Sequence, residues 1–187
     1  MSLEFAILGF LHYHPYSGYD LKKAFDTSVR HFWPADQSQI YRTLGRLTKQ
    51  GLVEVEIVEQ TERPDRKVYH ITPVGREALR QWVAGTLPLQ VTRSAPLIQV
   101  FFAGQLSDEE ILAKFEDMAK SIRDALEAYR QIPQQIEEYI QAIGSPREEF
   151  FWMLTLELGI QSAQTQLEWI ESVMQRIRNK KYSSDLG

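Results

Sequence analysis

Apolar residues in the first half of the chain recur at the three- and four-residue spacing of an α-helix, and short helix-breaking segments separate the runs. Residues with this spacing share one face of a helix. Ser17, Asp36 and Thr72 stand directly before three of the runs, and these residue types commonly cap helix N-termini. The pattern predicts helices over residues 3–13, 18–27, 36–50 and 73–83.

Two shorter runs between the third and fourth of these helices alternate between apolar and polar residues, as β-strands do. Val53, Val55 and Ile57 alternate with glutamates, which indicates a half-buried strand. Residues 66–71 form the return strand, and the polar stretch 60–65 joins the two. We expect a two-stranded ribbon that carries basic residues near its tip.

The second half of the chain is predicted to be helical throughout. A short apolar segment covers residues 96–106, and the acidic run after Ser107 favours the start of a long helix, because negative charge stabilises a helix N-terminus. Pro133 is expected to kink or interrupt that helix. Gly144 ends the stretch, and Pro146 opens the last helix.

The last helix carries an apolar seam whose members are separated alternately by three and four residues. A seam kept for more than three heptads favours coiled-coil-like packing. We expect two helices of this kind, joined by a tight turn, to form an antiparallel hairpin, and the seam to hold two copies of the chain together. The predicted dimerisation residues are Met153, Leu156, Ile160, Ala163, Leu167, Ile170, Met174 and Ile177.

These patterns predict a mainly α protein with a small β-wing. The expected architecture is an N-terminal winged helix-turn-helix followed by a C-terminal antiparallel helical hairpin. The expected domains are residues 1–84 and 95–187, joined by a linker over residues 85–94. A helix followed by a basic ribbon is the layout of a winged helix that reads duplex DNA.

Composition narrows the class of protein further. The hydrophobic fraction of 43% supports a packed core. No apolar run approaches the ~20 residues that span a bilayer, and Glu4 stands where a signal peptide would carry a basic residue. We therefore expect a cytoplasmic protein with no membrane partner. The absence of cysteine excludes disulfides and thiolate sites.

The net charge of −4 argues against a generic nucleic-acid binder, but the charge is unevenly distributed. Residues 1–84 hold 11 Lys and Arg against 10 Asp and Glu, whereas residues 85–187 hold 10 against 15. DNA binding by the first half would therefore require its cations to gather on one face. Such binding should be salt-sensitive and weak without a second subunit.

The predicted third helix separates its residues into two faces. Ile40, Leu44 and Leu47 cluster on one side, and long cations and small polar residues cluster opposite. The polar face suits a phosphate-lined major groove about 12 Å wide. Gly45 lies within that face at a cost of roughly 1 kcal/mol relative to Ala. Close approach by another molecule would explain this cost, and so would close packing inside the protein.

An ordinary surface helix is the alternative interpretation, because solvated charge is common on exposed faces. The ribbon adds independent weight to DNA binding, since its tip is basic as well. The predicted DNA-contacting residues are Gln37, Ser38, Tyr41, Arg42, Arg46, Lys49, Arg63, Arg66 and Lys67.

Four separated motifs occur in order within residues 3–84. The first two are Ile7-Leu8-Gly9-Phe10-Leu11 and Ser17-Gly18-Tyr19-Asp20-Leu21. The other two are Ser38-x-x-Tyr41-x-x-Leu44-x-x-Leu47-x-x-x-Gly51-Leu52 and Arg66-Lys67-Val68-Tyr69-x-Ile71-Thr72-x-x-Gly75. In these motifs the chain resembles the PadR family of bacterial transcriptional regulators. The helical second half resembles the longer members of that family in length and layout.

The resemblance implies a homodimeric repressor whose C-terminal helices form the dimer and often receive a small-molecule signal. It places Ser38, Tyr41 and Arg42 at recognition-helix positions near DNA, and Arg66 and Lys67 on the wing. The expected partners are double-stranded DNA and a second copy of the chain. A helical protein-interaction module that uses the winged helix as an adaptor is the alternative function.

Other chemistry receives little support from the residues. His12 and His14 straddle a helix end without an obvious carboxylate cluster, so we expect no metal, no cofactor and no enzymatic activity. Aromatic residues gather near two helix starts in the second half, where packing between helices and subunits is the simpler explanation. A pocket for a small aromatic effector is the alternative, with Phe101 and Trp152 as its candidate residues.

Overall fold

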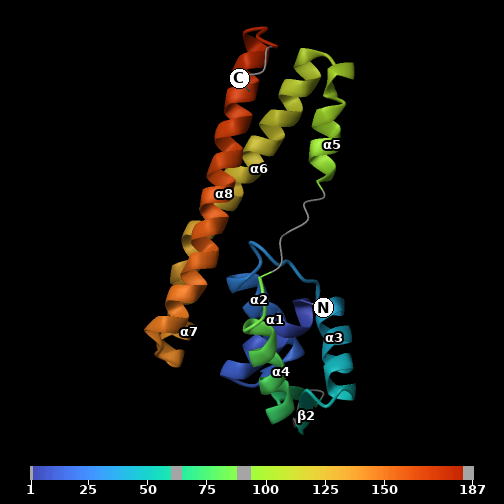
Figure 1. Cartoon of the computed structure of the whole chain (residues 1–187), viewed down its shortest axis with the longest axis vertical. Coiled ribbons are helices and arrows are strands. Elements are labelled where there is room, and N and C mark those ends of the chain that lie inside the picture. Colours follow the sequence, from blue (N-terminus) through green and yellow to red (C-terminus); the bar gives the residue numbers. More distant parts are fainter. Residues whose placement is uncertain (1, 60–64, 88–93, 183–187) are drawn as a thin grey trace. The chain divides into compact units, whose positions relative to one another are not determined.

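The computed structural model describes residues 2–59, 65–87 and 94–182, and it confirms a mainly helical chain with one small sheet (Figure 1). The elements follow one another as α1 (Ser2–Tyr13), β1 (Tyr16–Ser17), α2 (Gly18–Ser28), α3 (Gln37–Lys49), β2 (Val53–Val58), β3 (Arg66–Ile71), α4 (Pro73–Val83), α5 (Ala95–Phe101), the 3₁₀ helix η1 (Ala103–Gln105), α6 (Asp108–Gln135), α7 (Glu137–Ile143) and α8 (Pro146–Arg178). Residues 88–93 of the expected linker lie outside the described residues.

The chain divides into two units, which are described separately. The N-terminal unit comprises Met1–Pro88 together with Gln135–Ser145, and the hairpin unit comprises Leu89–Gln134 together with Pro146–Gly187. The helix α7 therefore belongs with the winged helix. Its Tyr139 joins the core of that unit and lies edge-on to the ring of Tyr13, with ring centroids 6.2 Å apart.

The core of the N-terminal unit is formed by one face from each of its first three helices, together with buried residues of the three strands. Ile7 and Leu8 of α1, Leu21 of α2, and Ile40 and Leu44 of α3 have no exposed surface. The periodicity that predicts the helices therefore also identifies their inner faces correctly. Burying these side chains stabilises the unit, at about 25 cal/mol per Å² of apolar surface removed from water.

The sheet has three strands rather than the expected two, in the order β1-β3-β2, and both pairs are antiparallel. The strand β1 escaped prediction because two residues are too few to show alternation. The prediction of a half-buried β2 holds only at its start. Val53 is buried, whereas Ile57 is 61% exposed, because the ribbon extends beyond the helices that cover its base.

Capping residues directly before α3 and α4 determine where these two helices begin. Asp36 caps α3 as predicted, and the Asp36 backbone N–H donates a hydrogen bond to Oε1 of Gln39, which completes a capping box. Thr72 caps α4 through the backbone of Gly75. A Cβ added at Gly75 would lie 2.2 Å from the carbonyl oxygen of Leu52, so only glycine lets α4 start this close to the strand.

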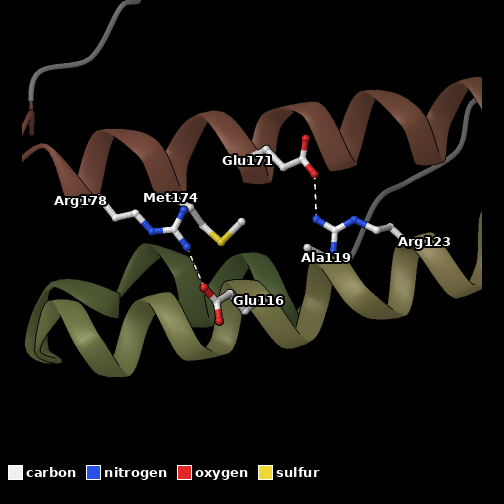
Figure 2. Close-up of a pocket in the computed structure, with 6 residues that line it drawn as sticks. All are labelled: Glu116, Ala119, Arg123, Glu171, Met174 and Arg178. Carbon is white, nitrogen blue, oxygen red and sulfur yellow. Dashed lines mark hydrogen bonds and ion pairs between the residues drawn. The ribbon is translucent and has the colours of Figure 1, made fainter.

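The hairpin unit is built on two long antiparallel helices, α6 and α8 (Figure 1). Phe115 and Ala119 of α6 pack with Ile170 and Met174 of α8 in its core. Two ion pairs cross between the helices above this core (Figure 2). They join Arg123 to Glu171 at 2.8 Å and Glu116 to Arg178 at 2.6 Å.

The connection between α6 and α8 differs from the predicted tight turn. Pro133 lies inside α6, which ends two residues later at Gln135, so the interruption comes after the proline rather than at it. The helix α7 then intervenes before α8. Gly144 ends α7 with a left-handed φ of 61°, and α8 begins at Pro146, as predicted.

The apolar seam of α8 faces inward along its whole length. Leu156, Ile170 and Met174 are buried, and the other predicted seam residues are half-buried. The C-terminal part of the seam, from Leu167 to Ile177, packs on α6 of the same chain. Its use between two copies of the chain stays a prediction.

Candidate nucleic-acid interface

The helix α3 presents one face to the protein core and the other to solvent. Ile40, Thr43, Leu44 and Leu47 are buried. Every residue at the predicted DNA-contacting positions of α3 is exposed, namely Gln37, Ser38, Tyr41, Arg42, Arg46 and Lys49. The fold therefore leaves the polar face of this helix open to a partner.

Arg42 and Lys49 are the cations of α3 that no carboxylate of the described residues pairs with. Within the described ranges neither forms an ion pair, and Arg42 donates only one hydrogen bond, from Nε to the carbonyl oxygen of Ser38 at 3.3 Å. The two side chains stand seven residues apart, which is two helical turns. They therefore extend from the same side of α3, opposite Leu44 and Leu47.

Arg46 differs from these two cations because the protein already engages it. Its Nε lies 2.5 Å from Oε1 of Glu4 in α1. The Glu4 side chain is 15% exposed and that of Arg46 is 53% exposed. The pair ties α3 to α1 and neutralises much of the charge that Arg46 would offer to a phosphate.

Polar residues at the N-terminus of α3 form hydrogen bonds with the capping residue Asp36. Ser38 donates a hydrogen bond to Asp36 at 2.7 Å, and the Gln39 backbone donates another to the same carboxylate at 2.7 Å. These hydrogen bonds lower the pKa of Asp36, so it stays ionised and continues to cap the helix at neutral pH. Gln37 is exposed beside this cap.

Tyr41 lies between α3 and the start of α2. A Cβ added at Gly18 would lie 2.4 Å from Cε1 of Tyr41, so the tyrosine ring rests directly on the backbone of Gly18. Tyr41 as a residue is nevertheless 43% exposed. Contact with Gly18 on one side orients Tyr41 and leaves the rest of its ring available to a partner.

The wing, formed by β2 and β3, has two described cations, of which one is ion-paired and the other is not. Arg66 at the start of β3 forms an ion pair with Asp20 of α2, and Ser17 donates a hydrogen bond of 2.5 Å to the same carboxylate. Burial opposes ionisation of Asp20, but the bonds from Ser17 and Arg66 outweigh it and lower its pKa. Lys67 is exposed and forms no ion pair among the described residues. Arg63, at the predicted tip, lies outside the described residues.

Sequence reasoning missed the two carboxylates that engage predicted DNA-contacting cations. Glu4 and Asp20 lie far along the chain from Arg46 and Arg66, and no local spacing relates the partners. The structure thus sorts the cations into those held by the protein and those left free. The free ones are Arg42, Lys49 and Lys67.

The hairpin unit carries a different kind of surface, rich in exposed apolar side chains. Phe101 is 82% exposed and meets Phe102 edge-on, and Trp152 is half-buried at the start of α8. The depression between α6 and α8 in Figure 2 is lined mainly by the paired charges. The exposed apolar side chains of α5 and α8 are Leu97, Ile98, Phe101, Phe150, Phe151, Leu154, Leu158 and Trp169.

Two further kinds of feature are absent from the described residues. No group of three or more His, Asp or Glu side chains in the described part of the chain is arranged to hold a metal ion. No helix in the same ranges is both long enough and apolar enough to cross a membrane.

Both units match known protein families. Residues 7–81 match the transcriptional regulator PadR-like family, and residues 92–178 match the family described as the C-terminal part of virulence activator alpha. The negative transcriptional regulator PadR of Bacillus subtilis is 26% identical over 176 residues, which cover 94% of this chain and 97% of that protein. A probable transcriptional regulator of Mycobacterium tuberculosis is 29% identical over 192 residues, covering 97% and 100% respectively.

Solved structures agree with the sequence matches. The crystal structure of B. subtilis PadR in complex with operator DNA has a TM-score of 0.79 and 27% identity, covering 95% of this chain and 99% of that one. The structure of the same protein with p-coumaric acid has a TM-score of 0.72, 26% identity and the same coverage. Residues 7–81 therefore form a domain of the transcriptional regulator PadR-like family, and the chain is similar to PadR transcriptional regulators over nearly its whole length.

Proposed function

We propose that the chain is a homodimeric, sequence-specific DNA-binding repressor. Each copy inserts α3 into the major groove and lays its wing on flanking phosphates. The observation that carries this proposal is the state of Arg42 and Lys49, which are exposed, free of ion pairs among the described residues, and opposite the buried face of α3. A cation in that state gains free energy by displacing counterions from DNA.

Two copies are required because one unit offers few free cations. Neutralising one phosphate contributes about −0.9 to the slope of log K against log salt, so the three free cations at the described DNA-contacting positions give a weak monomeric interaction. The exposed apolar side chains of α5 and α8 favour association of two hairpin units, since covering them removes apolar surface from water. A two-fold dimer would read an inverted repeat with half-sites ~10 bp, or a multiple of that, apart.

The hairpin unit is also proposed to receive a small aromatic acid as effector. The B. subtilis relative with p-coumaric acid and the exposed aromatic residues of this unit support that class of ligand. Phe101 and Trp152 are the proposed contact residues. We propose residues 1–84 as the DNA-binding domain, residues 85–94 as a linker, and residues 95–187, apart from α7, which packs with the N-terminal unit, as the domain for dimerisation and effector binding.

A salt titration of duplex binding tests the proposal. Fluorescence anisotropy with a labelled random-sequence duplex should give a negative slope of log K against log salt. In the double variant Arg42→Ala/Lys49→Ala the slope should become shallower by about 2 for each bound subunit. Lys114→Ala/Lys120→Ala removes the same charge from exposed positions of α6 and should leave the slope unchanged.

Two outcomes would contradict the proposal. One is an unchanged slope in the α3 variant, which would mean that these cations do not meet phosphates. The other is the absence of any salt-dependent binding by the wild-type chain, which would favour the alternative of a helical protein-interaction module.

A further inference from the structure

A glycine in the middle of α3 has no explanation inside the described protein. Gly45 lies well inside a helix of 13 residues, where glycine is less favourable than every residue except proline. Its φ is not positive, since among the described glycines only Gly51 and Gly144 have positive φ. No turn or left-handed conformation therefore requires glycine at this position.

Close packing within the protein does not require it either. A Cβ added at Gly45 would meet no other atom within 4 Å. Gly75 offers the contrast, because a Cβ there would collide with the carbonyl oxygen of Leu52 at 2.2 Å. Of the two explanations that the sequence allows for Gly45, internal packing is excluded, and approach by another molecule is left.

The neighbours of Gly45 indicate which molecule approaches. Arg42 precedes Gly45 by three residues and Lys49 follows it by four, so the three lie in one line on the exposed face of α3. Both side chains are free of ion pairs among the described residues. A duplex whose phosphates are held by the two cations must pass over the backbone between them, at Gly45.

We infer that Gly45 is the point where α3 comes closest to the base edges of the major groove, and that its missing side chain limits which sequences fit. This inference rests on the proposed function. The two long cations reach the phosphates along the groove walls, whereas the backbone of Gly45 has no side chain to hold it away from the groove floor. Any side chain here would push α3 outward and weaken base readout along its length.

Three variants test the inference on the duplex that the wild-type chain enriches from random DNA. Gly45→Ala should weaken binding to that duplex about tenfold, since overfilling a tight contact is costly. Gly45→Leu should weaken it further, because leucine is also a good helix former but much larger. Both variants should bind a random duplex almost as well as the wild type does, since Arg42 and Lys49 remain.

Gly9→Ala is the matched control. Gly9 also lies inside a helix, in α1, and a Cβ there would meet no atom within 4 Å. Both alanine variants should raise the Tm by about 2–4 °C, because alanine favours helix over glycine. Only Gly45→Ala should lose DNA affinity, so the loss cannot be attributed to a damaged fold.

The outcomes separate this inference from the proposed function. Gly45→Ala and Gly45→Leu that bind the enriched duplex as tightly as the wild type would overturn the inference while leaving the proposed function intact. Equal losses on the enriched and random duplexes would overturn the assignment to base edges. Failure of the wild-type chain to enrich any duplex would overturn both.

Discussion

The helices α3 and α8 are both amphipathic, but they leave different chemistry on the sides that face away from their cores. The outer face of α3 carries Arg42 and Lys49, two cations without an ion pair among the described residues. The outer side of α8 carries exposed leucines, among them Leu154 and Leu158. The inner face of each helix explains the fold of its own unit, and the outer face indicates what that unit binds.

The two outer faces differ in the free energy of their exposed side chains in water. A solvated cation is stable in water and gains only when a polyanion replaces its counterions. An exposed leucine is unfavourable in water and gains whenever any apolar surface covers it, by about 25 cal/mol per Å². We therefore assign the salt-dependent contact with DNA to α3 and the contact with a second copy of the chain to α8.

The largest effect is expected from charging the outer face of α8. Leu154→Asp/Leu158→Asp should give a monomeric chain, because burying two carboxylates between subunits is strongly unfavourable. Affinity for an inverted repeat should fall by roughly 10²–10⁴, the range typically lost when two linked binding events become separate. Sedimentation velocity would report the assembly state, and anisotropy would report the affinity.

Gln164→Asp is the control for that variant, since Gln164 is an exposed polar residue of the same helix. It should leave the assembly state unchanged. An intact dimer in the double leucine variant would show that the exposed leucines of α8 do not join the subunits. The inward seam would then be the surface to test next.

An intermediate effect is expected from Tyr41 on the outer face of α3. Tyr41→Ala should lower the ratio of affinities for enriched and random duplexes about tenfold, as expected for loss of a base contact worth 1–3 kcal/mol. Tyr41→Phe keeps the ring that rests on Gly18 and should lose less. Equal losses on both duplexes in competition anisotropy would assign Tyr41 to phosphate contact instead.

The smallest effect is expected from releasing a cation that the protein itself holds. Asp20→Asn removes the carboxylate that pairs with Arg66, so Arg66 becomes available to a phosphate. Affinity for a random duplex should rise a few-fold at low salt, and the salt slope should steepen by up to about 0.9 for each bound subunit.

Asp26→Asn removes a carboxylate from the same helix, where it pairs with Lys22, and serves as the control. Equal affinity in the two variants would mean that Arg66 does not reach DNA even when it is released.

The lowered pKa of Asp20 also predicts how the stability of the fold changes with pH. The Asp20–Arg66 pair stabilises the fold above the usual range of an Asp pKa, and this contribution is lost as pH falls through the lowered value.

What the sequence predicted well is local. Caps at Asp36 and Thr72 fix where helices start, because their partners lie three residues away in the chain. The inner faces of α1, α2 and α3 follow from periodicity alone. What it missed depends on residues far apart in the sequence. The pairing of Arg46 with Glu4 and of Arg66 with Asp20 leaves no local pattern, so the predicted cations all looked equivalent.

In the hairpin unit, too, the sequence pattern does not reveal which distant residues come into contact. The seam of α8 was read correctly as an apolar stripe, but periodicity does not say whether α6 of the same chain or a second copy covers it. The structure places its C-terminal part on α6. The sequence does not single out Leu154 and Leu158, because two leucines four residues apart are too short a pattern to mark a second apolar face of α8.

The most direct test of the central claim is a selection of bound duplexes from random DNA with the wild-type chain. If α3 enters the major groove once per subunit of a two-fold dimer, the recovered sequences should contain an inverted repeat whose half-sites are ~10 bp, or a multiple of that, apart. Sequences without enrichment, or a single unrepeated motif, would contradict the account.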